Sequence, residues 1–222
     1  INMVTTAGTK RFSDNEDMAN ALSHLAGVVL SVAGLTLMVI FSSLRNDAWK
    51  IVSSSLFGAS LILLYLSSTI AHWLPAGRFK DRFFVFDQAA IFILIAGTYT
   101  PLALVALRGA LGWVVFGIEW GLALTGIVRL LIRSSRFEEG VPLTDIIIYT
   151  LMGWLVVLIT GPVLEAIPFM GYMWIVIGGL FYTGGLVFFR VLKFRYHHLF
   201  WHLMVLGGSV SHFVAVFFYI IL

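Results

Sequence analysis

Residues 51–73, which read IVSSSLFGASLILLYLSSTIAHW, decide the fold because they form one long and continuous apolar run. A helix that crosses the hydrocarbon core of a bilayer, about 30 Å thick, needs about 20 predominantly apolar residues. A strand would alternate apolar and polar residues instead, and only a helix satisfies its own backbone hydrogen bonds in lipid. The stretch therefore predicts a membrane-spanning helix that carries a histidine near its end.

Six further runs of this kind predict seven membrane-spanning helices in a chain of 222 residues. The expected spans are residues 21–41, 51–73, 83–106, 112–132, 144–163, 171–190 and 198–222. Ser13 and Glu16 have the spacing of a capping box, so the first helix is expected to start before the membrane. The connections are too short for a soluble domain. We expect residues 1–222 to form a single all-α, seven-helix membrane domain, with residues 1–20 as a polar N-terminal tail and helix start.

The composition of the chain excludes several classes of protein. Hydrophobic residues make up 60% of the sequence and charged residues 11%, and the mean hydropathy is +0.99. A soluble domain carries about 25% charged residues and could not bury this much apolar surface in one core. A water-soluble globular protein, a disordered chain and a nucleic-acid-binding protein are therefore excluded. The chain has no cysteine, which also excludes disulfides, thiolate nucleophiles and cysteine-based zinc sites.

The basic residues are distributed unevenly between the two sides of the expected membrane. Of the 14 Lys and Arg residues, 11 lie in the N-terminal tail and in the second, fourth and sixth loops. Cytoplasmic loops of membrane proteins are enriched in Lys and Arg, so this bias predicts a cytoplasmic N-terminus and a C-terminus outside. The net charge of +3 is explained by topology signals and contacts with lipid headgroups, and no nucleic-acid partner is expected.

Three histidines are expected in one layer near the cytoplasmic face. His198 and His202 begin the seventh span, and their i, i+4 spacing places them on one helical face. Such a pair alone is also typical of interfacial histidines beside lipid headgroups. The topology, however, adds His72 from the end of the second span at a similar depth, and this coincidence favours a metal site.

Asp87 and Ser68 are the candidate catalytic residues beside these histidines. Asp87 lies one turn into the third span, and Ser68 precedes His72 by one helical turn. Three His ligands without cysteine favour zinc, and an open fourth position is typical of catalytic zinc. Asp87 could hold or deprotonate a zinc-bound water or bind the metal directly, and Ser68 could orient His72 or polarise a substrate carbonyl. The alternatives are an ion pair of Asp87 with Arg82 or Lys80, and helix packing through Ser68.

Further polar residues in the spans are harder to interpret. His24 lies in the first span near the same layer, and Glu16 precedes it by eight residues. The two could support the metal ligands or gate the site, or they could anchor the N-terminal helix. Glu119 lies in the middle of the fourth span, where a charge is costly, and no role is assigned to it. His212 lies too deep, by helix rise, to share a metal with His202.

Several motifs resemble the bacterial hemolysin III family, which belongs to the wider progestin and adipoQ receptor group. The matching segments are Glu16-Asp17-Met18-Ala19-Asn20 with Ser23-His24, Ser67-Ser68-Thr69 with His72, Phe86-Asp87 with Ile91-Phe92 and Ala96-Gly97-Thr98-Tyr99-Thr100-Pro101, and His198, Trp201-His202, Gly207-Gly208-Ser209 and His212-Phe213. The resemblance covers almost the whole chain. It implies a seven-helix protein of the bacterial inner membrane. It also implies an intramembrane zinc held by His72, His198 and His202, with Asp87 holding the zinc-bound water and Ser68 close by.

Three functions are compatible with such a site. The resemblance extends to receptors with ceramidase-like activity, which favours a zinc-dependent lipid hydrolase acting on an amide or ester. The alternatives are a zinc-stabilised receptor or sensor without hydrolysis, and a transporter or pore, so enzymatic activity is left open. The expected partners are membrane lipids, including a possible lipid substrate. The sequence does not define the oligomeric state.

Overall fold

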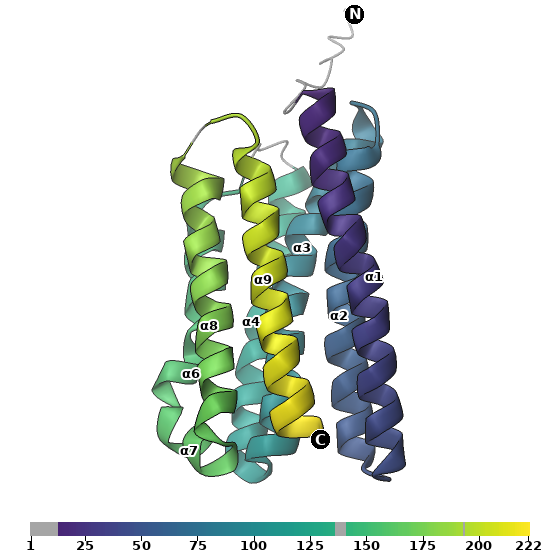
Figure 1. Ribbon diagram of the computed structural model, residues 1–222. Helices are drawn as coiled ribbons and strands as arrows, with labels where there is room; N and C mark the ends of the chain where they lie inside the picture. The colour runs from purple at the N-terminus through teal and green to yellow at the C-terminus, as the bar shows by residue number, and fades with distance from the viewer. Residues whose placement is uncertain (1–12, 136–140, 193) are drawn as a thin grey trace, which may run out of the picture.

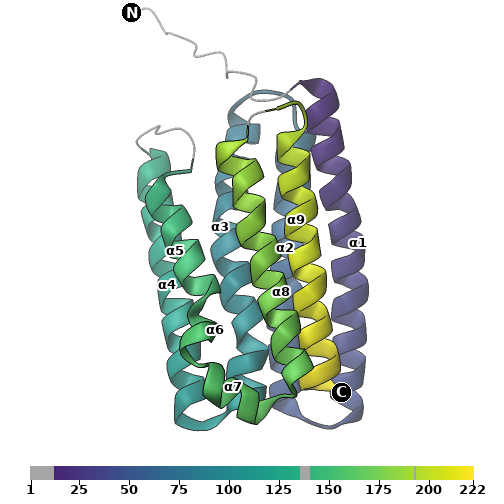
Figure 2. The same ribbon diagram turned by 60° about the vertical axis from the view of Figure 1, so that its left-hand side comes forward.

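The computed structural model describes residues 13–135, 141–192 and 194–222, and all secondary structure in these ranges is helical. In chain order the elements are α1 (Asp14–Leu44), α2 (Ala48–Trp73), α3 (Arg78–Pro101), η1 (Leu102–Leu107), α4 (Gly109–Ser135), α5 (Leu143–Gly153), α6 (Leu155–Leu158), α7 (Thr160–Ala166), α8 (Phe169–Leu186), η2 (Val187–Val191), α9 (His197–Val216) and η3 (Phe217–Ile221), where η marks a π-helix. They stand side by side in one elongated bundle (Figures 1 and 2). The prediction of an all-helical fold is therefore confirmed for the described residues.

Among the described residues, six helical segments are long and apolar enough to cross a membrane, compared with the seven spans predicted from the sequence. They are Asp14–Leu44, Ala48–Trp73, Arg78–Leu107, Gly109–Ser134, Phe169–Val191 and His197–Ile221. Their outer surface is apolar: large side chains such as Leu44 and Val29 are more than half exposed, while many Ser and His side chains are buried. This inverted distribution fits a bundle whose solvent is lipid.

The fifth predicted span, residues 144–163, is broken into the short helices α5, α6 and α7. α5 has 11 residues, too few to cross a bilayer by itself. Proline has no N–H to donate, so Pro162 leaves the carbonyl four residues earlier, at Leu158, without its helical partner, and α6 ends at Leu158. Figure 2 shows the three pieces following one another along the bundle, with α5 beside α4.

The ends of α1 and α2 are fixed by side-chain caps. The Ser13 hydroxyl accepts from the Glu16 N–H while the Glu16 carboxylate accepts from the Ser13 N–H, which confirms the predicted capping box. Asp47 caps α2 by accepting from the N–H groups of Trp49 and Lys50. α1 begins, α2 ends and α9 begins at the same end of the bundle (Figure 1). This shared end brings residues from distant parts of the sequence together.

Candidate metal centre

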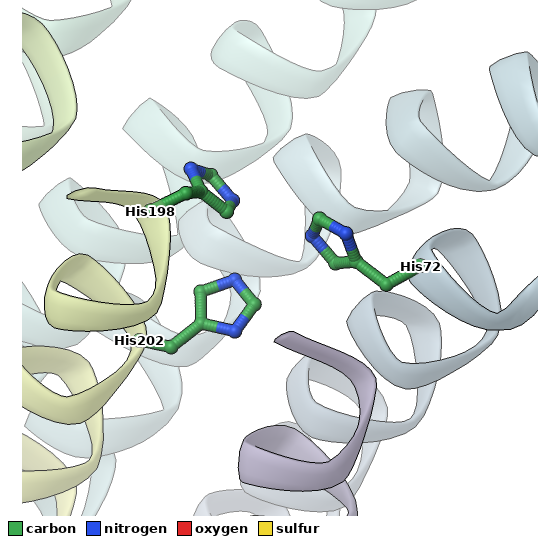
Figure 3. Close-up of side chains that lie close together, drawn as sticks. All are labelled: His72, His198 and His202. Carbon is green, nitrogen blue, oxygen red and sulfur yellow. The ribbon is translucent and has the colours of Figure 1, made fainter. Parts of the chain in front are cut away.

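His72, His198 and His202 converge at this end of the bundle, as the sequence predicts. One ring nitrogen from each lies within 4.8 Å of the others, and the ring centroids are 5.1 Å apart for His72 and His198 and 4.6 Å for His198 and His202. The rings face one another across the gap between α2 and α9 (Figure 3). Their exposed fractions are only 2%, 9% and 1% in sequence order.

The His72 ring is oriented by a carboxylate from α1. Asp17 Oδ1 lies 2.8 Å from His72 Nδ1, and Asp17 Oδ2 lies 2.8 Å from Lys80 Nζ, near the start of α3. Lys80 also donates to the Leu74 carbonyl, at 3.1 Å. A carboxylate on Nδ1 fixes the tautomer with its hydrogen there, which makes Nε2 the nitrogen that can ligate a metal. Metal-ligating histidines are typically held in this way.

The His202 ring is oriented by two further groups of α1. Its Nδ1 lies 3.2 Å from the Asn20 carbonyl oxygen and 3.1 Å from the Ser23 hydroxyl. The His24 ring stacks on the His202 ring, with centroids 3.5 Å apart and an angle of 11° between the planes. His202 Nδ1 is therefore also occupied, and α1 fixes two of the three rings without itself contributing a member of the convergent group.

The sequence allows two roles for Glu16, support of the histidine site or anchoring of the N-terminal helix, and Asp17, which the structure places beside His72, is not among its predicted site residues. Glu16 caps its own helix and accepts from the Tyr196 N–H at 3.0 Å, so it ties α1 to the start of α9, two residues before His198. The signal that could have found Asp17 is helical spacing. Asp17, Asn20 and His24 recur at i, i+3 and i+7, and all three are buried.

Ser68 and Asp87 lie one helical turn deeper than His72. Phe84 on α3 packs edge-on against the His72 ring, with centroids 5.2 Å apart, and Asp87 follows Phe84 by one turn. The Ser68 hydroxyl is buried and forms no hydrogen bond among the described residues. Asp87 does not belong to the group of converging donors. Lys80, a suggested ion-pair partner of Asp87, bonds to Asp17 instead.

The residues around the three histidines fit a bound metal ion. Buried polar atoms normally have hydrogen-bond partners, yet the Asn20 amide, both nitrogens of His24 and the Ser68 hydroxyl have none among the described residues. Three imidazoles held this close in a buried site cannot all be protonated, because like charges in low dielectric repel strongly. Neutral imidazole is the form that ligates zinc, and three such ligands leave a fourth position for water.

Most of the chain is similar to known proteins. The profile of a family described as Haemolysin-III related matches residues 12–213. The Hemolysin-3 homolog of Bacillus subtilis (strain 168) is 40% identical over 208 residues, which cover 94% of this chain and 96% of the relative. Hemolysin-3 of Bacillus cereus is 38% identical over 206 residues, or 93% and 92% of the two chains. The human Monocyte to macrophage differentiation factor is 24% identical over 213 residues, or 92% of this chain and 84% of its own length.

Proposed function

The chain belongs to the Haemolysin-III related family, and from its converging histidines we propose that it is a zinc-dependent hydrolase of lipid amides or esters. It is a multi-pass bacterial membrane protein, as its apolar helices and its Bacillus relatives indicate. The observation that carries the proposal is the convergence of His72, His198 and His202 in a buried site, with two of the rings oriented through Nδ1.

The topology proposed with this function has seven crossings. In it, α5, α6 and α7 together make the crossing that no single helix makes. The N-terminus is then cytoplasmic and the C-terminus outside, in agreement with the distribution of Lys and Arg. The histidine layer lies at the cytoplasmic end.

The residues around the histidines have separate roles in the proposed hydrolysis. Zinc, when bound, acidifies water and polarises an acyl carbonyl. Asp17 holds the His72 ring in the ligating tautomer. The Asp87 carboxylate accepts a proton from the attacking water and returns it to the leaving amine or alcohol as the acyl bond breaks. Ser68, whose hydroxyl is otherwise unpartnered in the described part of the chain, donates to the substrate carbonyl and polarises it.

The surroundings of the site favour a substrate that arrives through the membrane. Trp73, Phe79 and Phe86 lie beside His72, Lys80 and Asp87 in the sequence, and they are 60%, 71% and 55% exposed. Large apolar side chains exposed on a membrane protein are in contact with lipid acyl chains. An acyl lipid lying against these residues brings its amide or ester bond to the depth of the headgroups, where the histidines lie.

The test begins with metal content and continues with turnover. Elemental mass spectrometry of detergent-purified protein should find about one zinc per chain, lost in His202→Ala and retained in His212→Gln, a control at a buried histidine that bonds to the Ile175 carbonyl. Hydrolysis of ceramides or other acyl lipids that is lost in Asp87→Asn, with zinc retained, would support the hydrolase. Zinc without hydrolysis would instead support the receptor or sensor. Absence of zinc from protein never exposed to a chelator would overturn the proposal.

A further inference from the structure

Glu119 on α4 is a carboxyl group buried in the bundle, far from the histidines. Its exposed fraction is 0%, and neither carboxyl oxygen has a hydrogen-bond partner among the described residues. It lies in the middle of the inward-facing stripe of α4, between Val115 and Ala123, both also buried. Trp120, the next residue on α4, donates to the Thr100 hydroxyl at 3.1 Å, which places Glu119 at the level of Tyr99 on α3. Tyr99 lies 15 residues beyond Phe84, or about 22 Å along the helix. Glu119 is therefore separate from the proposed hydrolytic site.

No described basic side chain compensates a charge on Glu119. The segments packed against α4 are α3, η1 and α5. α3 contributes Tyr99, whereas the residues of η1, LALVAL, are all apolar. On α5, Asp145 is paired with Arg133, 3.3 Å away near the histidine end of the bundle, and Tyr149 adds only a neutral phenol. An ionised carboxylate without water or a counter-ion is strongly disfavoured in such a place.

Tyr99 bonds to the break in the fifth segment at the level of Glu119. The Tyr99 hydroxyl donates to the Gly153 carbonyl, at 3.0 Å, and accepts from the Val156 N–H, at 2.8 Å. A phenol has one hydrogen, and Gly153 already takes it. Tyr99 therefore cannot donate to an ionised Glu119 while its bond to Gly153 is in place. On α8, Tyr172 bonds to Thr160 and brings no positive charge.

We propose that Glu119 is a proton-binding site and that its proton is released only when the α5–α6 junction opens. In the closed arrangement the carboxyl group is protonated. Loss of the proton creates a charge that needs a hydrogen-bond donor, and the Tyr99 hydrogen becomes available only when its bond to the Gly153 carbonyl breaks. Discontinuous helices form ion-binding sites within the bilayer in many membrane transporters. The proposed hydrolysis does not use this site.

Infrared difference spectroscopy between neutral and alkaline pH tests protonation directly. The wild-type protein should show the carbonyl band of a protonated carboxylic acid at neutral pH, and this band should be lost in Glu119→Gln. It should be retained in Glu165→Gln, a matched control at an exposed position on α7. If Glu119→Gln does not accumulate, Glu119→Asp should shift the band. A band that neither variant alters would overturn the proposal. Zinc content measured on the same samples keeps this outcome distinct from failure of the proposed hydrolase.

Thiol labelling tests the coupling to the helix break. The chain has no native cysteine, so Val156→Cys introduces a single thiol at a position 2% exposed. Its rate of labelling is compared with that of the Val156→Cys/Glu119→Gln double variant at each pH, which cancels the reactivity of the thiol itself. The two should agree at neutral pH, and the protein that retains Glu119 should label severalfold faster at alkaline pH. Equal rates at every pH would refute the opening.

Discussion

Replacement of Asp17 by Asn tests whether α1 controls the metal centre. The carboxylate accepts from two donors, His72 Nδ1 and Lys80 Nζ, each at 2.8 Å. An Asn side chain of the same shape has only one acceptor oxygen, and its NH₂ group must face the other donor. Either His72 loses its orienting partner or Lys80, which is 7% exposed, loses its counter-ion.

The two consequences have different sizes and different signatures. Loss of a group that orients a metal ligand typically lowers metal affinity by about 10- to 100-fold, which corresponds to roughly 1.4 to 2.8 kcal/mol of binding free energy. Loss of the counter-ion of a buried charge lowers folding stability by up to about 3–5 kcal/mol. Lys80 retains its bond to the Leu74 carbonyl, so we expect the lower part of that range.

Competition with a fluorescent zinc chelator measures the affinity, and thermal unfolding without metal measures the stability. Asp17→Asn/Lys80→Met removes the buried charge and leaves the Asn oxygen free to accept from His72 Nδ1, so it should restore both stability and zinc affinity. Glu16→Gln is the matched control, because Glu16 lies in the same turn but bonds to Ser13 and Tyr196. Unchanged zinc affinity together with unchanged stability in Asp17→Asn, or an equal loss in Glu16→Gln, would refute the role of Asp17.

Three further outcomes are expected. Chelation of zinc should lower the Tm of the wild type, because a ligand at 100 times its Kd adds about 2.7 kcal/mol of stability, and it should leave His202→Ala unchanged; equal shifts in both proteins would place the metal elsewhere. Partial burial acts to raise the pKa of Asp47. The Lys50 N–H and the Arg108 guanidinium, which bond to the carboxylate, outweigh this effect, so the net pKa lies below its usual range. The stability that Asp47 contributes is therefore present above its ordinary pKa, about 3.9, and is lost as pH falls through the lowered value, so acid titration of unfolding should show a smaller loss in Asp47→Asn. Gly27→Ala adds a Cβ that overlaps the ring of Tyr65 and should cost about 1–3 kcal/mol of unfolding free energy, whereas Gly117→Ala, where nothing lies within 4 Å, should not destabilise; similar Tm values for the two would contradict this packing.

The convergence of the three histidines could be predicted from the sequence because it depends only on the lengths of the helices, the topology and the spacing of residues along one helix. The lengths of the apolar runs and the distribution of basic residues place His72 and His202 at the same depth, and the i, i+4 spacing adds His198. Choosing between Glu16 and Asp17 needs finer information. Neighbouring residues on a helix point about 100° apart, and which of them faces the core depends on the rotation of α1 against its neighbours.

The break in the fifth segment could not be predicted from hydropathy, for a different reason. Hydropathy averages over a window and does not register a single interruption, so residues 144–163 read as one span. Pro162, which lacks the N–H that a continuous helix would need, was a local signal of the break. The backbone groups left unpaired at the break bond to side chains of another helix, such as the Tyr99 hydroxyl that accepts from the Val156 N–H. These partners cannot be deduced from the sequence of residues 144–163.

The candidate metal centre depends on α1, although none of its three histidines lies on that helix. Asp17 orients His72, and the Asn20 carbonyl and Ser23 hydroxyl orient His202, so one rigid element sets the directions of rings on two others. A shift of α1 would therefore disturb both ligands together, whereas a shift of α2 or α9 would move only its own. Because a metal couples to the folding of the groups that hold it, bound zinc should protect the first turns of α1 from hydrogen exchange, although α1 contributes none of the three ligands. Protection confined to α2 and α9 would show that Asp17 and Asn20 only pack against a centre that orients itself.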